Sequence, residues 1–551
     1  MFKKRVKNSR FKRRRISKVQ LTLVLILLFI DIFFVIYLFM MNFAKTLHKE
    51  LLVTGTSKTV VFSLQAWDSY LYKTSQTQGL DAVTKFIETA PKFNDKVILP
   101  QGGMQNFSLV QSVSDSEDPF IKKNKFPSSS EHYLFNQMIQ GIPVYYATLA
   151  VHVRNKNEIY AVQGNLVLNQ TVNSQHISDE QAKEIALIAA QKENPKEQLK
   201  VVSAQRYIFN KRITSWDLAD DTNYLTLAVR IIREINKNSV SYNTNRMYFV
   251  DLTSGLTIYA DNYIGLPSDS SEGYNRHIFD CRSGVCLLVR AEGQPAAGGD
   301  GFADQLYTNA GHVYDWYWRH FQRKGLDGKG GPVNFFIKDN LVYGNLPNGG
   351  SCPGAMAYGD NTLDFCPLAT LGTYAAGYEM NHIVEFASHA FTNQFYETVS
   401  LNEAMSGIFT LLFTEEWPDK WSEDTATRLF SPNWDCSKTF HNRFNKDVIV
   451  HTAYLMVKGG NFNSCKVSPL GADTVANISY QALTRYFSPT SNYKDYYTAM
   501  LNACNDLYTI HSDICKQVRN ALLAAELDQQ PLDDIRGPVC SKKKGVAPSC
   551  Q

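Results

Sequence analysis

The segment that most constrains this chain is an apolar run at residues 19–44, VQLTLVLILLFIDIFFVIYLFMMNFA. A helix needs roughly 20 apolar residues to cross a bilayer, so this run is long enough to span one. It is longer than the core of a usual signal peptide, and no small-residue cleavage motif comes after it. Asp31 lies near the middle of this run, where an ionised carboxylate is costly. Two interpretations remain open: the carboxyl is protonated or paired with a partner helix, or a single-span anchor tolerates the charge. We expect an uncleaved transmembrane signal anchor.

Residues 1–18 set the expected orientation of that anchor, because they carry ten Lys or Arg and no acid. The positive-inside rule keeps such a segment in the cytoplasm and places the chain from about residue 46 onward on the other side. Removing these ten charges from the net charge of +4 leaves −6 for the rest of the chain. We therefore expect a single-pass membrane protein with extracytoplasmic C-terminal domains (periplasm, lumen or cell surface) and no nucleic-acid partner.

All ten cysteines lie after residue 280, and an even count in an exported region suggests disulfides. Pairing neighbours in order would close five short loops, the last of them making residues 536–551 a disulfide-closed tail, although the spacing leaves other pairings open. Reduced, buried thiols are the alternative, and the lack of a CxxC motif argues against a cysteine zinc site. The cysteines are Cys281, Cys286, Cys352, Cys366, Cys436, Cys465, Cys504, Cys515, Cys540 and Cys550.

The cysteine-free region 46–270 carries the signals of antiparallel strands. Residues 145–155 and 159–169 alternate between polar and apolar side chains, as half-buried strands do. Farther on, NRMYFVDLTSGLTIYADNY predicts a hairpin about the Ser-Gly pair at 254–255. The region should form one strand-rich module, separated from the cysteine-bearing region by the polar linker GLPSDSSEGYN.

Helix signals occur in both parts of the chain. Residues 178–193 begin with a capping box formed by Ser178 and Gln181 and continue as an amphipathic helix. Beyond residue 303 helices dominate the cysteine-bearing region 276–535, which includes one long helix over about 370–390. The pattern predicts the α+β class, with a strand-rich module followed by a domain whose C-terminal half is helical.

Several segments match one family in the order in which that family carries them. AMAYGDN at 355–361, YEMNH at 378–382 and LNEAMSGIF at 401–409 come after GIPVYYATLAVHVRNKNEIYAVQGNLV at 141–167. With them the chain resembles the thermolysin-like neutral zinc metallopeptidases in their precursor form, over most of residues 130–525. The resemblance implies a propeptide-like α+β domain at 46–270 and a thermolysin-like peptidase domain at 276–535.

The resemblance also implies a catalytic centre. Such a site needs three protein ligands for zinc and an open position for a water, whose proton a nearby glutamate removes. Glu379 matches that general base, and His382 and Glu403 match the second and third zinc ligands. Tyr378 replaces the first ligand, a histidine, and a neutral phenol with a pKa of about 10 is a poor zinc ligand.

Other departures from the family pattern lie close to these positions. Gly407 stands where the family has an aspartate that supports a zinc ligand, and such losses typically cost about 10–100-fold in affinity or activity. Arg443 falls at the place of the catalytic histidine that stabilises the oxyanion, while His441 could reach it only with a local gap. Tyr374 replaces an acid of a calcium site. We expect zinc to bind weakly or not at all, and we expect no calcium.

The family's substrate-binding residues are matched by Asn348 and Arg428, although Arg428 could instead only bridge structural carboxylates. The sequence therefore predicts an inactive, membrane-anchored pseudopeptidase that binds a peptide or protein partner or serves as a scaffold. An active zinc metalloendopeptidase with a rebuilt metal site is the alternative. One such arrangement would use His382, Glu385 and His389, which could share a face of one helix.

Overall fold

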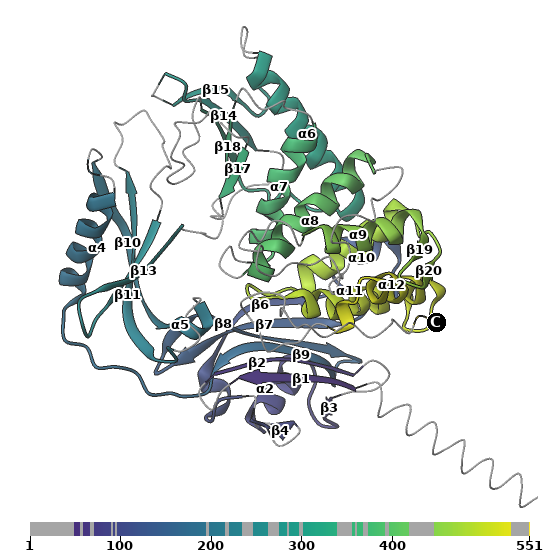
Figure 1. Cartoon of the computed structure of the whole chain (residues 1–551), viewed down its shortest axis with the longest axis horizontal. Helices are drawn as coiled ribbons and strands as arrows, with labels where there is room; N and C mark the ends of the chain where they lie inside the picture. The colour runs from purple at the N-terminus through teal and green to yellow at the C-terminus, as the bar shows by residue number, and fades with distance from the viewer. Residues whose placement is uncertain are drawn as a thin grey trace, which may run out of the picture.

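The computed structural model describes most of the chain between residue 49 and residue 529 (Figure 1). Asn348, Arg428, His441 and Arg443 lie outside the described residues, as do residues 1–48 with the apolar run. The described residues are 49–55, 59–66, 71–89, 92–93, 96–97, 99–193, 195, 198–214, 220–233, 246–262, 275–283, 286–296, 301–338, 355–358, 361–366, 373–391, 396–417, 446–529 and 550.

The N-terminal part is built on a sheet of eleven described strands in the order β1-β2-β9-β8-β10-β11-β12-β13, with β3 beside β9 and β6-β7 beside β8. Most neighbours pair antiparallel, and β8 with β10 is a parallel exception. The strands are β1 (Lys49–Gly55), β2 (Thr59–Ala66), β3 (Tyr72–Lys73), β6 (Phe107–Ser114), β7 (Glu131–Ile139), β8 (Ile142–Arg154), β9 (Glu158–Val167), β10 (Leu199–Asn210), β11 (Asn223–Arg233), β12 (Arg246–Asp251) and β13 (Thr257–Asn262).

Short helices and one small hairpin accompany this sheet. The helix α4 packs against β10 to β12 through three alanines spaced one turn apart, which contribute to a separate hydrophobic core. The elements are α2 (Gly79–Glu88), β4 (Lys92–Phe93), β5 (Lys96–Val97), η1 (Gly103–Asn106), α3 (Pro119–Asn124), α4 (Asp179–Glu193) and α5 (Lys211–Thr214).

The local sequence signals of this region are confirmed. The two alternating segments form β8 and β9, which pair antiparallel, and β12 and β13 form the hairpin that turns at 254–255. At the start of α4 the backbone N–H of Gln181 donates to Ser178 Oγ over 3.2 Å. The backbone N–H of Ser178 donates in return to Gln181 Oε1 over 2.9 Å, which completes the expected capping box.

The second part begins with a five-stranded sheet in the order β15-β14-β16-β18-β17 and then becomes helical. Figure 1 shows the long α6 and the pair α7 and α8 between this sheet and the C-terminal helices. The elements are β14 (Arg276–Asp280), β15 (Leu287–Ala291), α6 (Gly301–Phe321), β16 (Val333–Ile337), β17 (Ala355–Tyr358), β18 (Thr362–Phe365), α7 (Thr373–Ala387), α8 (Tyr396–Thr414), α9 (Lys446–Lys458), β19 (Gly460–Phe462), β20 (Cys465–Val467), α10 (Ala472–Arg485), α11 (Tyr493–Tyr508), α12 (Asp513–Ala524) and η4 (Leu527–Gln529).

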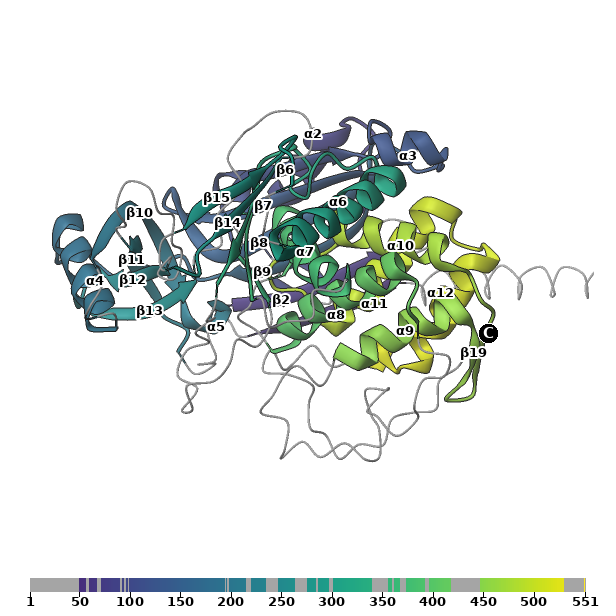
Figure 2. The same cartoon turned by 90° about the horizontal axis from the view of Figure 1, so that it is seen from above.

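The two parts share one hydrophobic core. Phe120 of α3 is fully buried and packs its ring against Phe321 of α6 and Tyr480 of α10, with ring centroids 5.6 and 5.3 Å apart. Tyr160 of β9 belongs to the same cluster. Figures 1 and 2 show the strands of the first sheet lying alongside the C-terminal helices, so the N-terminal part braces the helical part directly.

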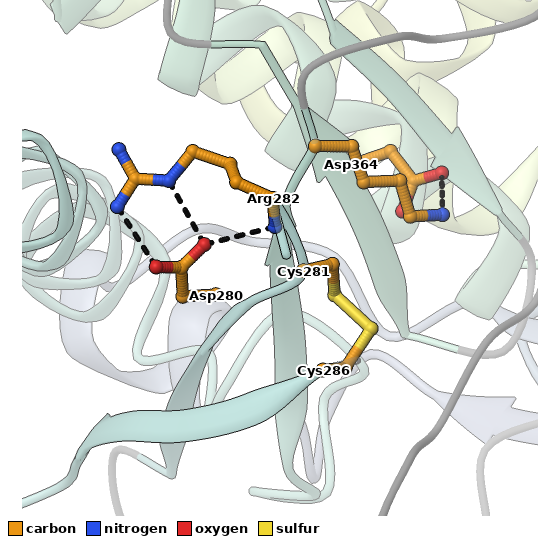
Figure 3. Close-up of a disulfide and its surroundings, with 6 residues drawn as sticks. Asp280, Cys281, Arg282, Cys286 and Asp364 are labelled. Carbon is orange, nitrogen blue, oxygen red and sulfur yellow. Dashed lines mark hydrogen bonds and ion pairs between the residues drawn. A yellow bond between two sulfur atoms is a disulfide. The ribbon is translucent and has the colours of Figure 1, made fainter. Parts of the chain in front are cut away.

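The described disulfides agree only in part with the expected pairing of each cysteine with its neighbour in the sequence. Disulfides join Cys281 to Cys286 and Cys504 to Cys515, as that pairing requires. The first closes the β14–β15 connection beside the Asp280–Arg282 ion pair (Figure 3). Cys465 bonds to Cys550 across 85 residues, so the expected partners Cys436 for Cys465 and Cys540 for Cys550 are wrong. The tail is therefore fastened to β20 instead of being closed upon itself.

The described helices can be compared with the dimensions of a bilayer. Within the described ranges, no helix combines the length and the apolar character needed to cross one. The expected anchor at 19–44 lies outside those ranges and stays a prediction.

Candidate functional site

Two packed helices, α7 and α8, carry the residues that correspond to the expected catalytic centre (Figure 1). Tyr378 and His382 lie one turn apart on α7 and therefore point to one side of the helix. Glu403 and Gly407 have the same spacing on α8. The helical spacing that the sequence predicts is thus present, and the structure brings three of the predicted positions together.

Tyr378 binds directly to the residue expected to be the third zinc ligand. Its phenol O–H donates to Glu403 Oε2 over 2.7 Å and also lies 3.0 Å from the backbone carbonyl oxygen of Glu403. Burial and the neighbouring Glu403 carboxylate raise the pKa of Tyr378 far above its ordinary value. The side chain is therefore a neutral hydrogen-bond donor, which is the opposite of what a metal ion requires from a ligand.

Lys446, the first residue of α9, adds a positive charge next to this pair. Its Nζ donates to the Tyr378 hydroxyl over 3.4 Å and lies 5.4 Å from the centre of the Tyr378 ring. An ammonium group at this place attracts the same carboxylate that a metal cation would use. The sequence reasoning missed Lys446, because 43 residues separate it from Glu403 and no motif marks it.

His382, the second expected ligand, is held by a buried carboxylate. Its Nδ1 lies 3.1 Å from Glu385 Oε2 and 3.0 Å from Ser406 Oγ. Burial, the largest single effect, lowers the pKa of His382, but the carboxylates of Glu385, Glu379 and Glu403 outweigh it and raise this pKa to about 9. The imidazole is therefore cationic near neutral pH and supplies a positive charge of its own.

Glu385 is the centre of a hydrogen-bonded network between α7 and α8. Asn381 Nδ2 donates to its Oε1 over 2.6 Å, Ser406 Oγ donates to the same oxygen over 2.9 Å, and Asn402 donates to its Oε2. Glu385 is fully buried, and both of its oxygens are used by these donors and His382. Asn402 and Ser406 flank Glu403 in LNEAMSG, but only the fold shows that they face Glu385.

The rebuilt site with His382, Glu385 and His389 is not supported. The helix α7 ends at Ala387, and His389 has a φ of 55°, in the left-handed region beyond that end. His389 therefore does not continue the helical face of His382. Each oxygen of Glu385 also has two hydrogen-bond partners within α7 and α8.

Gly407 leaves room for the tyrosine. A Cβ atom at this position would lie 3.7 Å from Cε2 of Tyr378 and 3.8 Å from a methyl group of Val450. Both are ordinary van der Waals distances, so the Tyr378 ring and Val450 already flank the space next to this glycine. The replacement of the supporting aspartate by Gly407 and the replacement of the first histidine by Tyr378 therefore fit together sterically.

The described residues of this site do not fit a three-ligand zinc ion. The first position is a phenol and the third accepts that phenol's hydrogen bond, so His382, which Glu385 supports through Nδ1, is the one position that keeps the arrangement of a ligating histidine. The predicted general base, Glu379, lies on α7 and is partly buried. Tyr374, one turn before Tyr378, is 41 % exposed and stacks its ring on Tyr378 at 6.2 Å.

Comparisons with known proteins agree with the family resemblance. A Fungalysin/Thermolysin Propeptide Motif matches residues 121–166, a thermolysin metallopeptidase catalytic domain matches 300–385, and a thermolysin metallopeptidase alpha-helical domain matches 418–527. The three matches occur in the order propeptide, catalytic domain, helical domain.

Whole-length relatives cover most of the chain at low identity. A bacillolysin from Bacillus amyloliquefaciens is 25% identical over 470 residues, which are 76% of this chain and 87% of the relative. A thermolysin from Alicyclobacillus acidocaldarius subsp. acidocaldarius is 26% identical over 464 residues, which are 71% of this chain and 82% of the relative. The solved precursor of protealysin, a metalloproteinase from Serratia proteamaculans, overlaps 47% of this chain and 90% of its own chain, with 17% identity and a TM-score of 0.36.

Proposed function

Because this chain belongs to the thermolysin-like metallopeptidase family in its precursor form, we propose that it is a catalytically inactive, membrane-anchored member of that family. The hydrogen bond from Tyr378 to Glu403 carries this proposal. It makes the first ligand position a proton donor to the third, so that Tyr378 presents an O–H group where zinc needs an imidazole lone pair, and Oε2 of Glu403 is engaged. A catalytic zinc site needs three protein ligands, and without them no water is activated for attack on a peptide bond.

A cationic hydrogen-bond network takes the structural place of the metal in this proposal. His382 supplies positive charge beside Glu385, and Lys446 supplies it beside the Tyr378 hydroxyl that bonds to Glu403. The two helices therefore stay packed without a metal, which explains how the fold persists after the ligand is lost.

The proposed role is that of a peptide-binding or protein-binding module, or a scaffold, outside the cytoplasm. Asn348 and Arg428 match the family's substrate-binding residues and would grip a peptide backbone without cutting it. The acidic body of the chain disfavours nucleic acid as a partner. The proposed anchor is the segment 19–44, oriented by the ten cations before it, and the three described disulfides agree with an oxidising compartment.

The second candidate is an active zinc metallopeptidase. It is favoured by the retention of Glu379, His382 and Glu403 and by the similarity to bacillolysins and to a thermostable neutral protease. This function would require Tyr378 to swing away from Glu403 and another side chain to replace the first ligand.

A cleavage assay tests the two candidates against each other. The full-length chain, supplied with zinc and an unfolded protein substrate, should cleave no faster than its Glu379→Gln variant, because no zinc-bound water is available for that glutamate to activate. The double variant Tyr378→His/Gly407→Asp restores an imidazole and its supporting acid, and should raise zinc affinity at this site by at least about tenfold. Zinc-dependent cleavage by the unaltered chain that disappears in Glu379→Gln would establish the second candidate.

A further inference from the structure

A second cluster of metal-binding residue types lies away from α7 and α8, where the N-terminal sheet meets the C-terminal helices. Asp115 comes directly after β6, His132 lies on β7, and Asp506 lies near the end of α11. One ligand atom from each of the three side chains lies within 4.8 Å of the other two. Among the residues that the structure describes, this is the one group of three or more such side chains that meets that distance.

His132 has a buried nitrogen that is directed into this group. The side chain is 5% exposed, and its Nε2 has no hydrogen-bond partner. That nitrogen lies 3.3 Å from Asp115 Oδ2. Two ligand atoms that each lie about 2.0–2.1 Å from a tetrahedral ion are about 3.3–3.4 Å apart, so the pair already has the spacing of two zinc ligands.

The other nitrogen of His132 is oriented as a ligating histidine requires. Its Nδ1 lies 2.9 Å from Nδ1 of His152, which is 1% exposed. If His132 donates from Nδ1, its Nε2 carries a lone pair toward Asp115, and metal-ligating histidines nearly always make such a supporting bond.

The carboxylates are held in place by neighbouring donors. Ser128 Oγ and Gln481 Nε2 donate to Asp115 Oδ2 over 2.5 and 2.9 Å. Ser130 Oγ donates to Asp506 Oδ1 over 3.2 Å, and Tyr486 donates to the other oxygen of that carboxylate. These bonds fix the orientation of both carboxylates, and an ion bound at Oδ2 of Asp115 would share that oxygen with its two donors.

The charges of the cluster leave a negative excess. Arg485 bonds to both Asp115 and Asp118, so its one positive charge is shared by two carboxylates, and Asp506 lies beside His132 and Asp115 as a third. These three carboxylates and one guanidinium leave an excess of negative charge, which is what a divalent cation would neutralise. Asp506 is partly buried, whereas Asp115 and His132 are buried.

From this geometry we infer that Asp115, His132 and Asp506 form a structural binding site for a divalent transition metal of the zinc type. One imidazole nitrogen and two carboxylate oxygens are a donor set that suits such ions. The site joins the first sheet to α11, so the bound ion would fasten the N-terminal part to the helical part. It is independent of the proposed loss of catalysis, because it shares no residue with α7 or α8.

Zinc binding to the full-length chain tests this inference. Protein stripped with a chelator is titrated with zinc chloride alone, bound zinc is measured by elemental analysis, and the midpoint of thermal unfolding is recorded. We expect one zinc per chain at saturation and a higher unfolding midpoint. His132→Ala and Asp506→Asn should weaken this binding by more than the roughly 10–100-fold that loss of a supporting bond costs.

Two controls locate the site. His320 and Asp473 form an exposed pair, with 3.5 Å between Nε2 and Oδ1, and His320→Ala should leave zinc binding unchanged. Asp506→Asn keeps the shape of the side chain and serves as the second variant if His132→Ala does not fold. A cooperative unfolding transition of Asp506→Asn in the presence of chelator shows that this variant is folded. Absence of zinc from the unaltered chain, or binding that survives Asp506→Asn, overturns the inference. Zinc binding that is lost in Glu403→Gln but retained in Asp506→Asn also overturns the inference. That outcome would place the zinc between α7 and α8 and would contradict the proposed lack of catalysis.

Discussion

Tyr378 differs from the histidine it replaces in what its polar atom can do. An imidazole nitrogen offers a lone pair to a metal, whereas the buried phenol donates its proton to Glu403. The substitution itself is visible in the sequence, because the helix around it keeps the family pattern. Its consequence is not visible, because the acceptor lies 25 residues away on another helix and Lys446 approaches from a third.

Removing the Tyr378 hydroxyl should cost stability. In Tyr378→Phe the Glu403 carboxylate loses a donor while the packing of the ring is kept, so the free energy of unfolding should fall by about 1–3 kcal/mol. Tyr374→Phe, one turn earlier and exposed, should change it by less than about 0.5 kcal/mol. Urea denaturation of both variants measures the difference, and equal effects would show that the bond to Glu403 contributes nothing.

Helices, strands and turns were predictable where their signals are local. The capping box of α4 and the hairpin between β12 and β13 are each encoded within a few residues, and both are confirmed. The bond between Cys465 and Cys550 was not predictable, because it depends on where α12 and β20 place a distant tail. The network around Glu385 was missed for the same reason, since Asn402 and Ser406 reach it only after α7 and α8 have packed.

The first turn of α11 should make stability depend on pH. Asp495 accepts the backbone N–H of Asn492 over 2.9 Å, and burial raises the pKa of Asp495 from 3.8 to about 7. A carboxyl whose folded-state pKa is raised stabilises the fold fully below its unfolded pKa of about 3.8, and this contribution is lost as the pH rises through about 7. Relative to Asp495→Asn, the unaltered chain should lose roughly 1–4 kcal/mol between about pH 4 and pH 7.

Urea unfolding across that pH range checks this prediction. Asp473→Asn removes an exposed first-turn aspartate of α10 and should change the free energy of unfolding by less than about 0.5 kcal/mol throughout. A constant difference between the unaltered chain and Asp495→Asn would contradict the raised pKa of Asp495.

The arrangement of the two halves of the molecule could not be read from the sequence. The order of the domains is implied by the family resemblance, but no motif marks the surface through which α3, β7 and β9 meet α10 and α11. That surface contains a shared aromatic core around Phe120 and a buried ion-pair system in which Arg485 bonds to Asp115 and Asp118. Both arise from contacts between residues more than 190 positions apart in the chain.

Arg485 should be important for holding the halves together. In Arg485→Met the stem of the side chain is retained, but Asp115 and Asp118 lose their buried partner, and the free energy of unfolding should fall by about 3–5 kcal/mol. Arg206→Met removes an exposed pair with Asp179 and should cost less than about 1 kcal/mol. Denaturant unfolding of the full chain compares the two variants, and similar losses would mean that the buried pair is not needed.

The packing of Phe120 between α6 and α10 has a consequence for processing of the chain. A protease that cuts between β13 and β14 would sever the polypeptide, yet each fragment would still complete the other's hydrophobic interior. The two fragments would separate only under denaturing conditions and would otherwise remain associated as a non-covalent complex. A molecule cut at this place would therefore keep its N-terminal half as a stably bound subunit.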